Sequence, residues 1–361
     1  MTSSPYSSKT LATCEDVLAA NITKKGFTAG KSHFNDVWAR DALYASWGVI
    51  SSHPSWAENT LSTLQAHMQN GQVPLRVGRQ NMVNVFLGLP TSHGPVYTND
   101  KNKDVALDPN SLYVITAAKL VENKPSVKEI YEDSVSRALE WLARHETNEL
   151  LTEGSYASWD DALKKQGVSL YNNVLYAAAL RKASKAFDLT YSAKARRVEE
   201  RITSALWNET YFNAWRGRKA CDVAGNLLAV YFNVGSRSQH QTILSHVDDQ
   251  QHAHKDSFLK TNYPSYHLTD TYLPFYLLGM QDYHDQGPYW TWITALEHLV
   301  RSRVNEDLSR VSNAKRLDEW IQDHGVIPEV LDQDLSPLKR LAYESETRFS
   351  WTAGLILAAQ E

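Results

Sequence analysis

Cysteine is almost absent from this chain of 361 residues, which contains only Cys14 and Cys221. Two cysteines so far apart in the sequence indicate neither a disulfide framework nor a zinc cage. His252 and His254 form an HxH pair, but they lie in a polar stretch rich in Gln and Asp, and no carboxylate pattern completes a metal site there. The sequence therefore predicts a protein without a bound metal.

Long apolar runs and an excess of positive charge are also missing. No apolar run approaches the ~20 residues that span a bilayer, and the first residues lack the charged and apolar segments of a secretory signal. The 37 Lys and Arg residues against 41 Asp and Glu residues give a net charge of −4. Electrostatics therefore favours neither nucleic acid nor an anionic membrane as a partner, and we expect a cytoplasmic protein. Nothing in the composition indicates an oligomeric state.

Linkers rich in Pro, Gly or Ser are absent, and alternating strand patterns are scarce; 75–77 and 83–85 could form one short hairpin. Apolar residues instead recur at three- and four-residue spacing, which predicts roughly eleven or twelve helices. Helix starts are indicated at Ser55 and Asp108-Pro109, and helix ends at Gly154, Gly225 and Gly325. The periodic segments are 43–49, 61–68, 112–121, 138–142, 170–180, 202–207, 227–231, 272–278, 292–300, 317–321 and 351–359.

This pattern predicts a single all-α domain over residues 1–361, with long aromatic-rich loops between the helices. A closed ring of helical hairpins and an open helical solenoid both fit the spacing, and periodicity alone does not separate them. The aromatic residues add a second clue, since 11 Trp and 18 Tyr outnumber 9 Phe. Such a bias suits a surface that is apolar in body and polar at its edge, as in a carbohydrate cleft or a large protein interface.

The segment Trp38-Ala39-Arg40-Asp41 stands at the start of an apolar helix. An adjacent Arg and Asp beside an aromatic ring can bind two neighbouring sugar hydroxyls, because guanidinium donors and carboxylate acceptors match them. The alternative is a structural ion pair at the start of the helix.

Two acidic groups lie in loops beside aromatic residues, glycine or proline: Trp159-Asp160-Asp161 and Pro328-Glu329. Inverting glycoside hydrolysis needs one carboxylic acid and one carboxylate ~6.5–9.5 Å apart across the sugar. A carboxyl beside Trp159 would be partly desolvated and could keep its proton near neutral pH. Each acid taken alone could also be a helix cap or a surface group.

Six short segments occur in order along the chain: VWARDALYASWG, GQVPLRVG, ASWDDALKKQGVSLYNNVLYAAAL, GPYWTWI, GVIPEVLD and ESETRFSWTAGLILAA. Together they resemble the (α/α)6-barrel glycoside hydrolases. The resemblance is nearest to the amylo-α-1,6-glucosidase (glycogen-debranching) type, with glucoamylases more distant, and it extends from about residue 37 to residue 359.

The resemblance implies a role for each matching residue. Asp161 falls on the general acid of the family, and Glu329 falls on its general base. Asp160 competes as the acid, because trehalase-like and mannosylglycerate-hydrolase-like barrels carry that acid directly after Trp or Met. Glu346 is the second choice for the base. The substrate-binding residues implied in the same way are Trp38, Arg40, Asp41, Gln72, Arg76, Asp108, Trp159, Gly287, Tyr289, Trp290 and Trp292.

The chain also departs from the debranching pattern. Ser158 stands where that pattern has another acid or hydroxyl-binding group, and 361 residues leave no room for the extra domains of many relatives. We therefore expect an inverting, exo-acting hydrolase that removes an α-linked glucose-type residue from a short oligosaccharide or a small glycoside. Two carboxylates suffice for that reaction, so no cofactor is expected. The alternatives are a sugar 2-epimerase or isomerase on the same barrel, working through His267 or His284, and a non-catalytic carbohydrate-binding protein.

Overall fold

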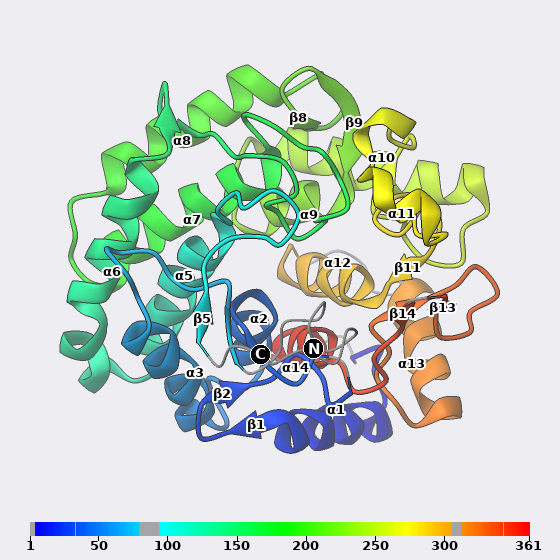
Figure 1. Ribbon diagram of the computed structural model, residues 1–361, viewed down its shortest axis with the longest axis horizontal. Coiled ribbons are helices and arrows are strands. Elements are labelled where there is room, and N and C mark those ends of the chain that lie inside the picture. The colour runs from blue at the N-terminus through cyan, green and yellow to red at the C-terminus, as the bar shows by residue number, and fades with distance from the viewer. Residues whose placement is uncertain (1–3, 33, 79–93, 305–311, 342) are drawn as a thin grey trace.

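The computed structural model describes residues 4–32, 34–78, 94–304, 312–341 and 343–361. Within these residues, six helices form a closed inner ring (Figure 1). Each inner helix packs against the next, and the last packs against the first, so the ring is closed within the described residues. The inner helices are α2 (Ala39–Trp47), α5 (Asp108–Asn123), α7 (Leu170–Ala186), α9 (Val223–Tyr231), α12 (Thr291–Arg303) and α14 (Ser350–Ala358).

An outer layer of helices alternates with the inner ring along the chain, and each outer helix packs on one or two inner helices. This alternation makes the architecture an (α/α)6 barrel, which confirms the predicted fold class and excludes the open solenoid. The outer helices are α1 (Ser8–Asn21), α3 (Pro54–Ala66), α6 (Lys128–Ala143), α8 (Ser192–Leu206), α10 (Arg237–His254) and α13 (Ser312–His324). A short helix, α11 (Leu273–Leu277), lies between α10 and α12.

Burial explains which helices are inside. Every residue of α9 is buried, as expected for a helix with neighbours on all sides. In α8 the buried residues are Ala195, Val198, Ile202 and Leu206, and their three- and four-residue spacing leaves one apolar stripe facing inward. The inner helix α9 is thus buried on every side, whereas the outer helix α8 is amphipathic.

Short antiparallel strands lie in the connections between helices. Three of them end immediately before an inner helix: β3 before α2, β9 before α9 and β11 before α12, so strand pairing fixes where these helices begin. The pairs and triplets are β1 (Ile22–Thr23) with β2 (Gly26–Phe27), β3 (Val37–Trp38) with β4 (Arg76–Val77) and β5 (Pro95–Val96), β6 (Glu146–Thr147) with β7 (Leu150–Leu151), β8 (Asn213–Trp215) with β9 (Arg218–Asp222) and β10 (Asn262–Tyr263), β11 (Tyr289–Trp290) with β12 (Val330–Leu331), and β13 (Lys339–Arg340) with β14 (Tyr343–Glu344).

The ring closes through a very tight contact between α2 and α14. A Cβ atom on Gly48 would lie 2.2 Å from the carbonyl oxygen of Gly354, and a Cβ on Gly354 would lie 2.4 Å from the Cα of Ala45. Both distances are below any contact that carbon atoms tolerate without displacement of the backbone. Glycine at these two positions therefore allows the first and last inner helices to approach each other.

Several local predictions need correction. Gly325 follows the end of α13 with a φ of 67°, as predicted, but Gly225 lies inside the first turn of α9, where its N–H donates to the capping carboxylate of Asp222. Gly154 is not a helix end either, because α6 ends at Ala143. The strand at 76–77 exists but pairs with β3 and β5; its expected partner at 83–85 lies outside the described residues.

The polar stretch that includes His252 and His254 is also helical. It belongs to α10, which begins at a capping box formed by Ser236 and Gln239. The HxH pair therefore lies in the last turn of a helix and not in a loop. No group of three or more His, Cys, Asp or Glu side chains suited to a metal occurs in the described part of the chain.

Candidate functional site

The predicted site residues gather where the inner helices begin. Arg40 and Asp41 lie in the first turn of α2, and Asp108 is the first residue of α5. Arg40 donates to both carboxylate oxygens of the fully buried Asp108, through Nε to Oδ2 and through Nη2 to Oδ1 at 3.0 Å. This bidentate pair joins the starts of two neighbouring inner helices and fixes the guanidinium. Arg40 thus forms its ion pair with Asp108, and not with the adjacent Asp41 that the ion-pair alternative named.

An aromatic and cationic group lies beside this helix start. The guanidinium of Arg76 in β4 lies 4.9 Å from the ring centroid of Trp38, and its Nε is 3.8 Å from the Oδ2 of Asp36. Trp38 is partly exposed, so one part of its ring remains accessible. Gln72 instead donates through Nε2 to the carbonyl of Tyr97 at 3.0 Å, which gives its side-chain amide a structural partner.

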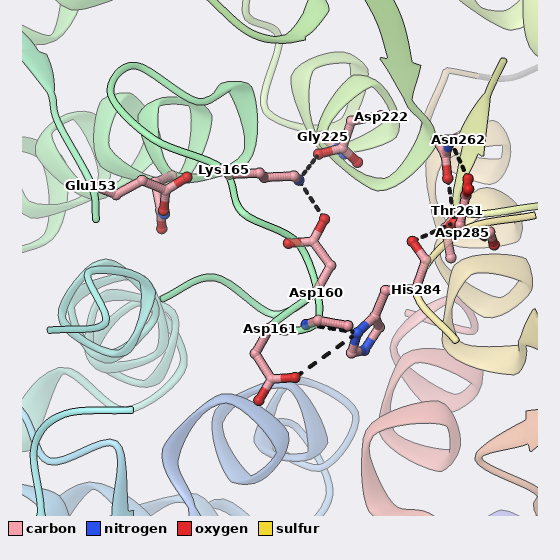
Figure 2. Close-up of polar contacts among 12 residues, drawn as sticks. Glu153, Asp160, Asp161, Lys165, Asp222, Gly225, Thr261, Asn262, His284 and Asp285 are labelled. Carbon is pink, nitrogen blue, oxygen red and sulfur yellow. Dashed lines mark hydrogen bonds and ion pairs between the residues drawn. The ribbon is translucent and has the colours of Figure 1, made fainter. Parts of the chain in front are cut away.

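Asp161 and Asp160 point in opposite directions from one turn (Figure 2). The side chain of Asp161 is 47% exposed; its Oδ2 is 2.9 Å from the Nζ of Lys101, and its Oδ1 is 3.9 Å from the Nδ1 of His284. Burial alone would raise the pKa of Asp161, but nearby positive charge, chiefly the Lys101 ammonium and with it Arg40, holds the pKa below its ordinary value. The expectation that a carboxyl group beside Trp159 keeps its proton near neutral pH therefore does not hold for Asp161.

Asp160 is buried and bound to the inner structure. Its carboxylate lies 2.5 Å from the Nζ of Lys165, which also contacts Asp222 at 3.1 Å. Burial raises the pKa of Asp160 to about 6, against the lowering effect of Lys165. Of the two consecutive acids, Asp161 is the one whose side chain is accessible.

Glu329 lies directly before β12 and is almost completely buried, with 4% of its surface exposed. Its Oε2 accepts a hydrogen bond of 2.6 Å from the hydroxyl of Tyr343 and a longer one, 3.4 Å, from the backbone N–H of Glu346. Burial raises the pKa of Glu329 to about 8, with Asp41 and Glu346 adding like-charge repulsion. In this arrangement Glu329 therefore holds a proton at neutral pH.

Asp41 and Glu346 complete a group of acids around Glu329. Burial raises the pKa of Asp41 to about 7, although Arg40 opposes the shift. Glu346 accepts hydrogen bonds through Oε1 from the backbone N–H groups of Ser32, at 3.0 Å, and Phe34, at 3.2 Å. These bonds tie the C-terminal loop to the loop before α2, so Glu346 has a structural role and is less suited than Glu329 to accept a proton from water.

The dipeptide Tyr283-His284 stands between the two predicted catalytic acids. The ring of Tyr283 meets that of Tyr343, the hydrogen-bond partner of Glu329, edge to face at 4.9 Å. His284 lies against Asp161 and accepts a hydrogen bond from the N–H of Ala162 at its Nδ1, 3.2 Å away. Burial lowers the pKa of His284 to about 3, so its imidazole is neutral. One dipeptide thus touches the surroundings of both acids.

Of the predicted substrate-binding residues Gly287, Tyr289, Trp290 and Trp292, only the two tryptophans contact the surroundings of Asp161. Trp290 stacks on His284, with centroids 4.8 Å apart and planes 17° apart, and Trp159 meets both rings edge to face. Trp292 is fully buried, and its ring centroid lies 4.8 Å from that of Trp159. The buried Nε1 donor of Trp159 has no hydrogen-bond partner among the described residues, which leaves it available to a ligand.

Tyr289 and Gly287 have their contacts elsewhere. The ring of Tyr289 packs on Phe258, and its hydroxyl accepts a hydrogen bond from the N–H of Ser257 at 3.3 Å. The carbonyl of Gly287 accepts from the Nζ of Lys260 at 2.8 Å. The contacts of Gly287 and Tyr289 are therefore with Lys260, Ser257 and Phe258, and not with Asp161 or Glu329.

Sequence reasoning missed four residues at this site: Lys101, Tyr283, Tyr343 and Lys165. Lys101 lies in a polar loop between β5 and α5, and no pattern marks its contact with Asp161. Lys165 follows Lys164 closely after the two aspartates, and the sequence does not reveal which of the two lysines is buried. The contacts of Lys101 with Asp161 and of Lys165 with Asp222 depend on long-range packing.

A separate cavity of about 460 Å³ lies at the opposite ends of the inner helices. It is lined by residues near the ends of α7, α9 and α12, none of which is acidic: Arg181, Lys182, Val230, Tyr231, Phe232, Asn233, Arg303 and Val304. Without a carboxylate pair, this cavity does not match the predicted chemistry, so we place the candidate site at the helix starts. Within the described ranges, no helix is both long enough and apolar enough to cross a membrane.

Comparison with solved structures identifies the same fold in several glycosidases, although no protein-family model and no curated protein sequence matches the chain. GH63 mannosylglycerate hydrolase from Thermus thermophilus, in complex with Tris and D-glycerate, superposes with a TM-score of 0.71 at 12% identity, covering 98% of this chain and 100% of that one. A wild-type glycosidase gives 0.67 at 13% identity, over 97% of this chain and 96% of that one.

A rhamnosidase from Klebsiella oxytoca with rhamnose bound also matches, with a TM-score of 0.67 at 12% identity. The match covers 97% of this chain but only 63% of that longer protein. Identities this low establish the fold alone. The structural matches confirm the six-hairpin barrel, while the nearer resemblance to debranching enzymes and glucoamylases stays a prediction.

Proposed function

We propose that this protein is a glycoside hydrolase that uses Asp161 and Glu329 as its pair of carboxyl groups. One observation carries the proposal: the accessible Asp161 and the buried Glu329 flank the same Tyr283-His284 dipeptide, at the end of the barrel where Arg40 and Asp41 begin α2. Two carboxyl groups across a sugar-sized site are the minimum machinery for glycoside hydrolysis.

In the proposed reaction, Asp161 protonates the leaving oxygen and Glu329 removes a proton from the attacking water, with inversion at the anomeric carbon. The exposed side chain of Asp161 can reach an aglycone that enters from solvent. The hydrogen bonds from Tyr343 and from the N–H of Glu346 hold the carboxyl of Glu329 in one orientation, which favours a positioned base. Asp41 binds sugar hydroxyls, and Trp38 offers a stacking surface.

Protonation in this structure runs opposite to these roles. Lys101 lowers the pKa of Asp161, while burial raises that of Glu329 to about 8. The active form, with Asp161 protonated and Glu329 ionised, is therefore a minor species at neutral pH. This observation favours a second candidate mechanism, in which Glu329 is the acid and Asp161 is the base. The Lys101→Met variant separates the two assignments.

The proposed substrate is a short oligosaccharide or small glycoside with an α-linked glucose-type residue at its non-reducing end. The similar folds include a mannosylglycerate hydrolase and a rhamnosidase, so mannosides and rhamnosides belong in any test. The isomerase alternative gains little support, because the exposed His267 only caps the turn at η2 (Leu268–Asp270) by accepting from the N–H of Thr269. Of the two histidines considered for that reaction, His284 alone lies beside one of the proposed catalytic carboxyl groups.

Time-resolved proton NMR of the purified protein with a substrate panel tests the proposal. The panel contains maltose, isomaltose, panose, kojibiose, trehalose, sucrose, glucosylglycerate, mannosylglycerate and an α-rhamnoside. Release of the β-anomer from an α-glucoside would establish inversion and identify the linkage. A 2-epimerised product that persists in Asp161→Asn but is lost in His284→Asn would establish the isomerase instead.

Variants then assign the carboxyl groups. Asp161→Asn and Glu329→Gln should each lose ~10²–10⁴-fold in kcat while keeping the thermal transition of a folded protein. Glu344→Gln makes the same chemical change at an exposed position on β14 and should leave kcat unaltered. Wild-type turnover by Asp161→Asn would refute its assignment and transfer the role to Asp160.

A further inference from the structure

A buried lysine lies behind the two consecutive aspartates. Lys165 has 2% of its side chain exposed, and its Nζ is 2.5 Å from the Oδ2 of Asp160 and 3.1 Å from the Oδ2 of Asp222 (Figure 2). Both carboxylates are also buried, at 3% and 1%. A buried ammonium between two buried carboxylates is well compensated, and removing it leaves two like charges facing each other.

Asp222 anchors this ion-pair cluster to the barrel. It is the last residue of β9 and the N-cap of the inner helix α9, where its Oδ1 accepts a hydrogen bond of 3.0 Å from the N–H of Gly225. The other oxygen, Oδ2, receives Lys165. Because α9 is buried on all sides, Lys165 connects Asp160 to one of the most firmly held points of the fold.

The opposite side of the turn is anchored to the neighbouring strand. Asn262 in β10 pairs directly with Asp222 in β9, and its Nδ2 donates to the Oδ1 of Asp285 at 2.8 Å. The hydroxyl of Thr261 lies 3.1 Å from the carbonyl of His284 and 2.9 Å from that of Asp285.

His284 in turn accepts a hydrogen bond from the N–H of Ala162, directly after Asp161. The turn that carries Asp160 and Asp161 is therefore held from both sides by the same β9–β10 pair. On one side the link runs through Lys165, and on the other through His284 (Figure 2).

We propose that Lys165 is a positioning residue that sets the direction of Asp161. By holding Asp160 toward Asp222, Lys165 makes the next carboxyl group point the other way, toward Lys101 and His284. This inference rests on the proposed function, since it concerns the delivery of the proposed acid. It assigns Lys165 no contact with substrate, because its ammonium is enclosed by the two buried carboxylates.

Without Lys165, the cluster loses the cation that holds Asp160 inward. Asp160 and Asp222 then repel each other or one takes up a proton, and the carboxyl of Asp160 is released. Its Oδ1 has no hydrogen-bond partner among the described residues, so the carboxyl group loses its inward hold, and the turn keeps only its backbone hydrogen bonds and the bond of Ala162 to His284. A rotation that brings Asp160 outward removes Asp161 from its place.

The test compares Lys165→Met with Lys164→Met, which removes the same charge at the exposed neighbouring position. Lys165→Met should lower kcat by ~10²-fold with KM little changed, because a displaced acid weakens only the transition state. The loss should be much smaller with a glycosyl fluoride, whose leaving group needs little protonation. Equal losses on both substrates, or no loss, would overturn the inference. Lys164→Met should behave as wild type.

A second measurement does not depend on activity. The carboxyl of Asp161 is titrated by carbon-13 NMR in wild type, Lys164→Met and Lys165→Met. Displacement from Lys101 should raise the midpoint of Asp161 by ~1 pH unit in Lys165→Met only. An unchanged midpoint would overturn the positioning role, even in a protein that hydrolyses no glycoside, whereas a raised midpoint without any turnover in wild type would overturn only the proposed function.

Asp222→Asn gives a milder version of the same change, should Lys165→Met fail to fold. Asparagine caps helices as well as aspartate does, so α9 keeps its first turn while Lys165 loses one of its two anions. The expected result is a smaller fall in kcat and a smaller upward shift of the Asp161 midpoint than in Lys165→Met. No change in either quantity would overturn the inference.

Discussion

Replacement of Lys101 by Met is the most informative single change at this site. The Nζ of Lys101 lies 2.9 Å from the Oδ2 of Asp161 and is held near the rings of Tyr272 and Phe275. It is the strongest specific influence that keeps Asp161 ionised. Met has an unbranched apolar side chain that resembles the stem of Lys, so the variant removes mainly the charge.

The size of the effect follows from the distance. Two unit charges 2.9 Å apart interact with about 1.4 kcal/mol at the dielectric constant of water, or about one pKa unit. We use the value for water because 47% of the Asp161 side chain is exposed, and exposed ion pairs are strongly screened. Lys101→Met should therefore raise the pKa of Asp161 by about one unit.

The dependence of kcat/KM on pH then reports both the contact between Lys101 and Asp161 and the role of Asp161 as acid or base. The acid limb of the profile, which follows Asp161 because its pKa is the lower of the two, should move up by about one pH unit. If Asp161 is the acid, the maximum should also rise up to about tenfold, because the fraction with Asp161 protonated and Glu329 ionised grows as the two pKa values converge. If Asp161 is the base, the maximum should stay constant.

Lys103→Met is the matched control. It removes the same charge from the same loop, but the Lys103 side chain is 72% exposed and pairs only loosely with Asp100, at 3.8 Å. An acid limb that stays in place in Lys101→Met, or that moves equally in both variants, would refute the electrostatic reasoning. A shifted limb with an unchanged maximum would refute the assignment of Asp161 as the acid.

Three further changes test the fold around the site. The folded-state pKa of Glu329, about 8, lies above its ordinary 4.5. Its contribution to stability is therefore complete below pH 4.5 and lost as the pH rises through 8. Glu329→Gln should raise the free energy of unfolding by on the order of 2–4 kcal/mol more at pH 9 than at pH 4. Equal effects of the substitution at the two pH values would contradict this. Gly354→Ala should lower that free energy by about 1–3 kcal/mol in urea, because its Cβ meets the backbone of Ala45. Arg40→Lys should cost roughly 1–3 kcal/mol in the same assay and raise KM, since Lys cannot make the bidentate contact with Asp108.

The barrel could be predicted in outline, but its closure could not be derived from the helical period. An open solenoid and a closed ring bury the same helix faces, and the local pattern is identical in both. Closure depends on the contact between α2 and α14, where Gly48 and Gly354 admit a backbone approach that no periodicity reveals. One signal was available and missed: Ser236 and Gln239 have the spacing of a capping box and mark the start of α10.

The individual acids were harder to predict than the fold. Asp160 and Asp161 are consecutive, so motif matching alone left both open as the acid. They differ in the structure because Lys165 holds Asp160 toward Asp222 and Lys101 contacts Asp161, and the positions of Asp222 and Lys101 depend on tertiary packing. The expectation that a carboxyl group beside Trp159 is desolvated fits the raised pKa of Asp160, about 6, but not that of Asp161, because the nearby Lys101 ammonium was not foreseen.

Closure of the barrel and assembly of the candidate site are the same event. Glu329 lies far from Asp41 in the sequence, yet Asp41 contributes to its raised pKa. They meet because the N–H of Ser350, at the start of α14, donates to the carbonyl of Ala29 at 3.0 Å, and because Glu346 binds the backbone N–H groups of the loop before α2. Gathering three acids in this way costs stability above neutral pH, so the closing contacts of α14 must offset the repulsion that the site creates. A chain that closes less firmly should therefore lose the ordered position of Glu329 before it loses the barrel.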